Sequence, residues 1–213
     1  MKRTTLFAVL IGFLSINPAS ATTFTISMVA DNDFAIFSGT SSGINHLLYQ
    51  NNVDWPSQIN ALSSLTFNLA AGDDRFYVLG MGGGGVEENI SGEVNGVNMT
   101  NPSVVVSMSS DLSSYLTGYP NNVDLGTYNA SLADVQAAFP NLTWGNPVLN
   151  SSQTVIQQAG FGQGFTFSTF SAHLFSFQAE EVGVEVPEPS VLVILALGLL
   201  GLAFAAGSRR QPA

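Results

Sequence analysis

The chain has 213 residues and no cysteine, and only 9% of its residues are charged. Four of its five basic residues lie at the two ends of the chain, at Lys2, Arg3, Arg209 and Arg210. Between Thr22 and Val186, fourteen acidic residues against one arginine, Arg75, leave a net charge of −13. Such a body repels phosphate backbones, which argues against nucleic acid as a partner. The lack of cysteine excludes disulfides, thiolate metal sites and a cysteine nucleophile.

The first 21 residues have the three parts of a secretory signal peptide. A basic start is followed by a mostly apolar run over residues 6–16 and by Ala19-Ser20-Ala21. Ala19 and Ala21 satisfy the small-x-small rule of signal peptidase, so we predict a signal peptide over 1–21, cleaved after Ala21. A retained membrane anchor is the alternative, but the apolar run is short for a membrane span.

A second membrane-directed segment occupies residues 187–213. Pro187, Glu188 and Pro189 precede an uncharged run over 191–207, which ends just before Arg209 and Arg210. As a helix this run would be about 25 Å long, slightly short of a typical hydrocarbon core. The arginines favour the cytoplasmic side. We therefore predict a transmembrane helix over about 191–207 and export of residues 22–186 as one domain, tethered at first to the inner membrane.

This tail resembles the PEP-CTERM sorting signal of Gram-negative bacteria, because a Pro-Glu-Pro motif, an apolar helix and a basic cluster follow in that order. The resemblance implies recognition by an exosortase, cleavage near the motif, and release or attachment at the cell surface. It also implies a connection with exopolysaccharide and biofilm matrix. The basic cluster has only two arginines, which leaves the efficiency of processing open. A single-span anchor without cleavage is the alternative.

The body between the two ends has the pattern of a β-rich protein. Residues 23–29 alternate between apolar and polar side chains, as in a half-buried strand. Asn95-Gly96 predicts a type I′ hairpin turn, and Ser131 predicts the start of a helix that Pro140 ends. Many short strands with Gly, Asn and Ser turns indicate an antiparallel, jelly-roll-like β-sandwich with one short helix. The other predicted strands cover 34–37, 46–49, 65–70, 75–79, 104–108, 165–167 and 173–177, the last two with a bulge or bend between them.

Residues 29–37, with the sequence VADNDFAIF, resemble the opening of galactose-binding-like β-sandwich modules of exported proteins. The resemblance covers roughly residues 23–80, where Trp55 and the Gly-turn-strand unit over 72–78 fill later positions of the pattern. The expected Asn-Gly after the second strand is replaced by Ser38-Gly39. Sugar binding varies within that fold, so the resemblance leaves the ligand open.

Two glycine-rich motifs have counterparts in enzymes. Residues 80–85 match the G-x-G-x-x-G pattern of dinucleotide-binding proteins, but the next residues lack helix periodicity and place Glu87 and Glu88 where phosphate would bind. Residues 39–43 match the G-x-S-x-G pattern of hydrolases, but the next residues have the pattern of loop and strand. We predict a flexible Gly-rich turn and a Ser/Gly loop, without catalytic residues.

Acidic and aromatic residues supply the remaining candidates. Asp31, Asp33, Asp73 and Asp74 are candidate ligands of a structural calcium ion, with solvated turn carboxylates as the alternative. The tyrosine candidates lie in polar sequence, which predicts exposure, whereas burial in the core is the alternative for the tryptophans. The candidates for stacking on sugar rings are Trp55, Tyr115, Tyr119, Tyr128 and Trp144.

Targeting signals at both ends and a strand-rich acidic body predict a non-enzymatic protein of the cell surface or extracellular matrix. The expected partners are signal peptidase, an exosortase, the inner membrane before processing, and polysaccharide as a ligand. A secreted carbohydrate-active hydrolase is one alternative, although no spacing singles out a pair of catalytic carboxylates. A self-assembling adhesin is another.

Overall fold

The computed structural model describes residues 22–51, 53, 57, 63–85, 88–123, 125–151 and 160–186. The strands in this part of the chain are β1 (Thr22–Asp31), β2 (Asp33–Thr40), β3 (Gly43–Gln50), β4 (Ser63–Leu69), β5 (Arg75–Met81), β6 (Glu88–Val94), β7 (Val97–Asn98), β8 (Ser107–Ser109), β9 (Trp144–Gly145), β10 (Val148–Asn150), β11 (Gly164–Phe167) and β12 (Ala172–Gln178). The helical elements are the α-helix α2 (Leu132–Ala138) and the 3₁₀ turns η2 (Ser113–Tyr115), η3 (Phe139–Asn141) and η4 (Glu180–Val182).

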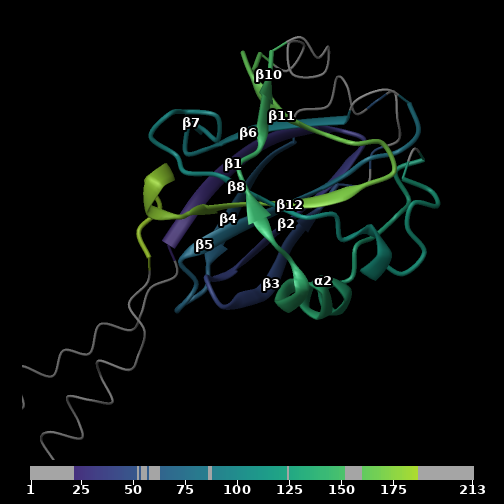
Figure 1. The fold of residues 1–213 in the computed structure, drawn as a ribbon. Helices are drawn as coiled ribbons and strands as arrows, with labels where there is room; N and C mark the ends of the chain where they lie inside the picture. The colour runs from purple at the N-terminus through teal and green to yellow at the C-terminus, as the bar shows by residue number, and fades with distance from the viewer. Residues whose placement is uncertain are drawn as a thin grey trace, which may run out of the picture.

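The described strands form two antiparallel six-stranded sheets that pack face to face (Figure 1). The first sheet has the order β10-β11-β6-β1-β4, with β7 also paired to β6, and we call it the β1 sheet. The second has the order β3-β2-β5-β12-β8-β9, and we call it the β2 sheet. Helix α2 lies against β3 of the β2 sheet. An all-β, antiparallel sandwich with one short α-helix is thus confirmed for the described residues.

The core between the sheets follows from the two-residue period of the strands. On β1, Phe24, Ile26 and Met28 are buried in the sandwich, while Thr23 and Thr25 are exposed on the other face. Rings from both sheets meet there, as for Phe24 and Phe76, whose centroids lie 4.7 Å apart. These contacts bury the apolar face of each sheet, which is the main stabilising contribution expected for such a fold.

Strands β11 and β12 confirm the two strand pieces predicted over 165–167 and 173–177, but they lie in opposite sheets and are joined by a turn rather than by a bulge. The chain leaves the β1 sheet after Phe167 and enters the β2 sheet at Ala172. In the turn between them, Phe170 has a φ of 53°, a left-handed conformation that is uncommon for a bulky residue. The rings of Phe165 and Phe175 then stack across the core with centroids 5.6 Å apart.

The β2 sheet is also buried on its outer face, and this second core was not predicted. The chain between Asp111 and Leu142, including α2, folds over that face. It places Leu112, Val135 and Ala138 against alternate residues of β5 and β12, among them Leu79 and Leu174. Because both faces are covered, β2 and β5 are buried along almost their whole length and have continuous apolar sequences.

The local predictions have mixed outcomes. Helix α2 is confirmed, and Ser131 caps it by accepting a hydrogen bond from the backbone N–H of Ala133. The hairpin turn is also confirmed, since Val94 pairs with Val97 and both Asn95 and Gly96 have positive φ. The strand predicted over 104–108 is wrong in extent, because β8 covers only Ser107–Ser109.

Neither glycine motif has the geometry of its enzymatic counterpart. The turn of the β2–β3 hairpin contains Ser41 and Ser42, and strand rather than helix follows Gly43. The run over 80–85 leaves β5, and the next described element is strand β6 rather than a helix. Close packing explains one glycine of this run, because a Cβ on Gly82 would lie 2.5 Å from Cγ of Glu88.

The predicted membrane-directed segments lie outside the described residues. These are the signal peptide over 1–21, the Pro187-Glu188-Pro189 motif, and the helix over about 191–207 with its two arginines. Among the described residues, no helix has the length and the apolar sequence needed to cross a bilayer.

Candidate functional site

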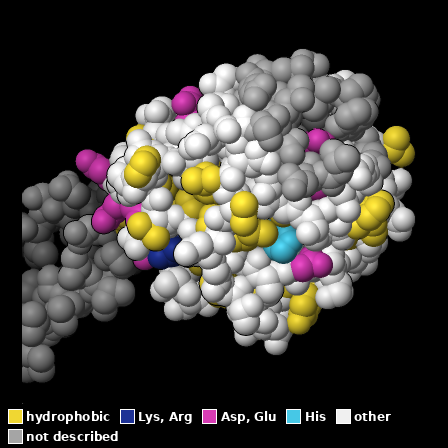
Figure 2. All heavy atoms as spheres, turned by 45° about the horizontal axis from the view of Figure 1, so that its top comes forward, with side chains coloured by type: hydrophobic (Ala, Val, Ile, Leu, Met, Phe, Trp, Pro, Cys, Tyr) yellow, Lys and Arg dark blue, Asp and Glu magenta, His cyan; other side chains and the backbone are white. Residues whose placement is uncertain are grey.

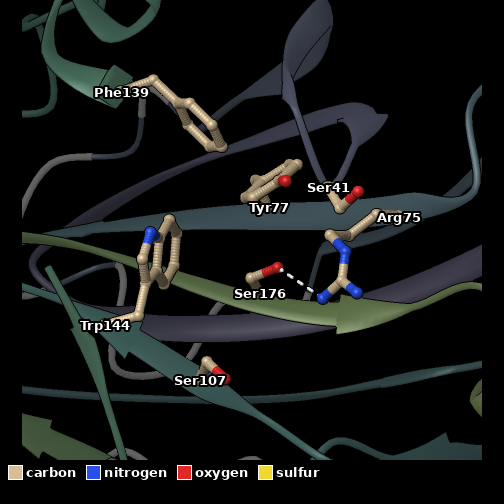
Figure 3. Close-up of a pocket in the computed structure, with 7 residues that line it drawn as sticks. All are labelled: Ser41, Arg75, Tyr77, Ser107, Phe139, Trp144 and Ser176. Carbon is tan, nitrogen blue, oxygen red and sulfur yellow. Dashed lines mark hydrogen bonds between the residues drawn. The ribbon is translucent and has the colours of Figure 1, made fainter. Parts of the chain in front are cut away.

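A pocket lies at the end of the outer face of the β2 sheet that the 111–142 segment leaves open. Leu79 pairs with Leu174 under the cover, and two residues further along the same ladder Tyr77 pairs with Ser176 at the pocket. The cavity has a volume of about 220 Å³ (Figure 3). Its lining residues are Arg75 and Tyr77 of β5, Ser176 of β12, Ser107 of β8, Trp144 of β9, Phe139 of η3 and Ser41 of the β2–β3 turn.

Three aromatic rings form one side of this pocket. The ring centroid of Tyr77 lies 5.5 Å from that of Phe139, at an interplanar angle of 87°, and 6.1 Å from that of Trp144. The Phe139 and Trp144 centroids are 5.9 Å apart. Trp144 is the most accessible of the three, at 38% exposed, whereas Tyr77 is buried. The aromatic side of the pocket therefore has one accessible ring, the indole of Trp144, packed against two less accessible rings.

The opposite side of the pocket is polar. Arg75 donates a hydrogen bond from Nη1 to Oγ of Ser176, over 3.2 Å, and both side chains face the pocket in Figure 3. The Nε–H of Arg75 is buried and has no hydrogen-bond partner within the described residues. A buried donor without an acceptor is costly, and such groups call for an explanation.

The hydroxyl group of Tyr77 takes part in the structure of the pocket rather than in acid–base chemistry. It donates a hydrogen bond to the carbonyl oxygen of Thr40 in the β2–β3 hairpin. Burial raises the pKa of Tyr77 to about 12, and the positive charge of Arg75 only partly opposes this shift. Tyr77 is therefore neutral at physiological pH, and it fixes the position of the hairpin turn that carries Ser41.

A buried carboxylate holds the same hairpin in place. Asp73, at 1% exposed, accepts hydrogen bonds from Oγ of Ser38 at 2.5 Å and from Nδ2 of Asn45 at 2.6 Å. Nδ1 of His46 lies 2.9 Å from Oδ2 of Asp73. The next residue, Asp74, is exposed, and its backbone N–H donates to the carbonyl of Gly39. Asp73 thus fastens β2 and β3 to the start of β5, beside the pocket.

Comparison with known proteins identifies the C-terminal segment. Residues 185–210 match the PEP-CTERM protein-sorting motif. The chain carries a PEP-CTERM sorting signal. This motif indicates an exported protein that is sorted by an exosortase and passes through the membrane to be secreted or held at the cell surface. No curated protein and no solved structure matches the chain.

The match confirms the predicted sorting signal, because it spans Pro187, Glu188, Pro189, Arg209 and Arg210. Cleavage near the Pro-Glu-Pro motif, the transmembrane helix and signal-peptide cleavage between Ala21 and Thr22 stay predictions. The described residues end at Val186, which packs against the core between the sheets.

The four candidate calcium ligands do not come together. Asp33 lies opposite Met81, whereas Asp73 and Asp74 precede Arg75, which lies opposite Gly39. The two acidic pairs are therefore at opposite ends of the β2–β5 ladder, roughly 20 Å apart at the usual rise per residue of a strand. The described residues contain no group of three or more acidic or histidine side chains that could hold a metal ion.

The candidate stacking residues have different surroundings. Trp144 lines the pocket, and Tyr115 is equally accessible, at 39% exposed, but lies outside the pocket on η2. Tyr119 is half-buried and donates its hydroxyl to the carbonyl of Gly82, and burial raises its pKa well above the ordinary range. The predicted exposure of Tyr128 is wrong, since this residue is only 6% exposed in the second core. Trp55 lies outside the described residues.

Sequence reasoning did not find five of the residues that form the pocket, namely Arg75, Tyr77, Ser107, Phe139 and Ser176, and it assigned Ser41 only to a Ser/Gly loop. One signal was present, since Arg75 is the sole Lys or Arg between Thr22 and Val186. Arg75 and Ser176 are also polar residues at outward positions, and Gln178 follows at the next outward position of β12, whereas the outward residues Leu79 and Leu174 are apolar. Neither signal shows that the two residues are neighbours until the register of β5 and β12 is known.

Proposed function

We propose that this PEP-CTERM protein is a non-enzymatic, polysaccharide-binding protein of the cell surface or extracellular matrix, and that the pocket beside Trp144 is its binding site. One observation carries the proposal: an accessible indole face lies opposite an arginine and serine hydroxyls in a single small cavity. A domain sorted to the cell exterior meets extracellular polysaccharide there.

The chemistry of the pocket suits a sugar ring. A pyranose has an apolar face of C–H groups that packs on an aromatic ring, and a rim of hydroxyl groups that needs hydrogen-bond partners. Trp144 offers the first kind of surface, and Arg75 and Ser107 offer the second. A cavity of about 220 Å³ is smaller than pockets for drug-sized ligands, which favours one ring of a longer chain.

The same residues support a binding role rather than hydrolysis. None of the seven residues drawn in Figure 3 is a carboxylate or a histidine. Glycoside hydrolysis by the common mechanisms needs two carboxyl groups on either side of the scissile bond. Tyr77, the lining residue whose pKa is raised to about 12, holds its proton too tightly to serve as a general base near neutral pH.

The sorting signal and the resemblance of residues 23–80 also bear on the proposed ligand. PEP-CTERM signals are associated with exopolysaccharide and biofilm matrix, which favours a polysaccharide ligand, and the resemblance of residues 23–80 to galactose-binding-like modules is compatible with one. The role in the matrix, the jelly-roll strand order and the galactose-binding-like identity are parts of this proposal that need their own tests.

A pair of matched aromatic variants tests the proposal. The full chain, purified in detergent, is titrated with extracellular polysaccharide from the producing bacterium, and binding is measured by affinity electrophoresis and calorimetry. We expect Trp144→Ala to weaken binding about tenfold or more, the effect of losing roughly 1.4 kcal/mol of stacking. Tyr115→Ala removes an equally accessible ring outside the pocket and is expected to leave binding unchanged.

Two results would contradict the proposal. Wild-type protein that binds no polysaccharide would rule out the function itself. Binding that survives Trp144→Ala but is lost in Tyr115→Ala would place the site elsewhere. Trp144→Phe keeps an aromatic face and is expected to retain most of the affinity, which separates stacking from a general loss of structure.

A further inference from the structure

Arg75 has an exceptional position in the charge distribution of the exported body. It is the sole Lys or Arg among residues 22–186, which also contain fourteen acidic residues. On the face drawn in Figure 2, basic side-chain atoms occur at one place, with apolar and acidic side chains near them, on a surface that is mostly uncharged. Within the described residues, Arg75 forms no ion pair with any carboxylate. A single cation without an anionic partner therefore lines the pocket.

The nearest acidic residues in the sequence do not neutralise it. Both oxygens of the Asp73 carboxylate are engaged by the side chains of the β2–β3 hairpin. Asp74 has an exposed side chain and forms no ion pair within the described part of the chain. The positive charge of Arg75 is thus available to a ligand in the pocket.

The hydrogen bonds of the guanidinium group indicate which edge is available. Nη1 is used by Ser176, and Nε–H is buried without an acceptor. Nε is therefore enclosed by protein atoms, but Nη1 carries a second N–H, so the two terminal nitrogens, Nη1 and Nη2, together present parallel N–H groups with the spacing of the two oxygens of a carboxylate.

We infer that the ligand of this pocket is an acidic polysaccharide, whose uronic acid carboxylate pairs with Arg75 while its ring packs on Trp144. This inference rests on the proposed function and specifies its class of ligand. One cation balances one carboxylate, whereas a phosphate group would bring more negative charge than the pocket compensates.

The negative net charge of the body does not prevent such binding. At physiological ionic strength, charges further apart than about 8 Å are largely screened from one another. The contact between Arg75 and a carboxylate is local and partly buried, so it is screened much less. Selection for the carboxylate therefore depends on this local contact with Arg75.

The test compares two oligosaccharides that differ only in the carboxyl group. The full chain in detergent is titrated with an oligogalacturonate and with the same oligosaccharide after reduction of its carboxyl groups to alcohols. We expect wild-type protein to bind the acidic form about tenfold more tightly or better, as for one charge-assisted bidentate pair. Arg75→Gln keeps hydrogen-bonding groups without the charge, and is expected to remove this preference.

Control variants make the outcome specific to the guanidinium group. Arg75→Gln is expected to bind the acidic and the reduced oligosaccharide with equal affinity, and thermal unfolding beside the wild-type protein shows that the variant is folded. Arg75→Lys keeps the charge but not the planar fork, so it is expected to keep only part of the preference. Trp144→Ala is expected to weaken binding of both oligosaccharides by similar factors.

The failure of this inference differs from the failure of the proposed function. Equal binding of both oligosaccharides, weakened by Trp144→Ala, would keep the polysaccharide site and overturn the acidic ligand. A preference for the acidic form that persists in Arg75→Gln would also overturn it, because the anion would then bind elsewhere. Tighter binding of a sulfated galactan than of oligogalacturonate would replace the carboxylate by a sulfate. No binding of any oligosaccharide would remove the proposed function together with the inference.

Discussion

The two ends of the outer face of the β2 sheet are built on the same strands and differ completely. At one end, the paired residues Leu79 and Leu174 are buried under the 111–142 segment. Two residues along the same ladder, Tyr77 and Ser176 border an open pocket, and Arg75 lies beyond them. Strand parity alone does not distinguish structural positions from ligand-binding ones here. What distinguishes them is how far the 111–142 segment extends over the sheet, because it covers one end of the outer face and leaves the other end open.

The comparison also explains why the pocket keeps its shape. The covered end is held by apolar packing, which is insensitive to charge, whereas the open end is held by a buried carboxylate and by the hydroxyl group of Tyr77. Substitutions at the covered end should therefore affect stability, and substitutions of accessible residues at the open end should affect binding. The border between them, at Asp73 and Tyr77, should show both effects.

The largest effect is expected at the covered end. Leu174 is fully buried between β12 and the 111–142 segment, so Leu174→Ala removes packed methyl groups and leaves a cavity. We expect a loss of about 2–5 kcal/mol in the free energy of unfolding, measured by urea denaturation of the full chain in detergent. Leu149→Ala, at a residue 50% exposed on β10, should cost roughly 0.5 kcal/mol or less.

An equal loss in the free energy of unfolding for Leu174→Ala and Leu149→Ala would contradict the difference between the two ends, because the 111–142 segment would then not be packed on the sheet. A large loss of polysaccharide affinity in a folded Leu174→Ala protein would also contradict this difference, since the covered end would then take part in binding.

A somewhat smaller effect is expected at the border between the two ends. Asp73→Ala leaves the buried hydroxyl group of Ser38 and the amide of Asn45 without their acceptor. We expect a loss of about 2–4 kcal/mol in the free energy of unfolding, together with weaker binding, because the hairpin that carries Ser41 is released.

Asp74→Ala is the matched control for this position. It removes the neighbouring, exposed carboxylate and keeps the backbone hydrogen bonds of residue 74 to Gly39 and Ala179. The midpoints of thermal unfolding of Asp73→Ala and Asp74→Ala, measured in the same buffer, are sufficient for this comparison. If Asp74→Ala proved as destabilising as Asp73→Ala, general surface charge rather than the buried network would hold the hairpin.

The sequence predicts the core between the two sheets better than the second core on the outer face of the β2 sheet. The alternation of Phe24, Ile26 and Met28 with polar residues is a local pattern, and it predicts the inner core correctly because one face of β1 is accessible. The continuous apolar runs of β2 and β5 do not show which residues face the inner core and which face outward. The second core could therefore not be predicted without knowing which segment covers the outer face. Tyr128 shows the same limit, since its polar neighbours indicate exposure although its ring packs on Tyr119 in that core.

The pocket depends on strand register, which no local pattern contains. Trp144 was a candidate for stacking from its residue type alone, without a partner. Arg75, Ser107 and Trp144 become neighbours because β5, β12, β8 and β9 are adjacent in that order. The calcium prediction is not supported for the same reason, since the register of β2 and β5 separates the two acidic pairs.

The smallest effect is expected for a hydroxyl group of the covering segment. The hydroxyl of Tyr128 is buried and has no hydrogen-bond partner within the described residues. Tyr128→Phe keeps the ring and removes an unsatisfied polar group, so we expect a gain of about 1 kcal/mol or less in the free energy of unfolding at neutral pH. A loss of stability instead would indicate that a bound water molecule satisfies this hydroxyl group.

The same variant has a pH signature. Burial raises the pKa of Tyr128 to about 12, compared with 10 in the unfolded chain. Above pH 10 the unfolded state releases this proton first, so the folded state binds more protons and loses stability as the pH rises toward 12. Tyr128→Phe removes this contribution, and its advantage over the wild-type protein should therefore grow by roughly 1 kcal/mol between pH 9 and pH 11. An advantage that does not change over this range would show that the ring of Tyr128 is open to solvent, and that the covering segment protects the sheet less completely than its packing indicates.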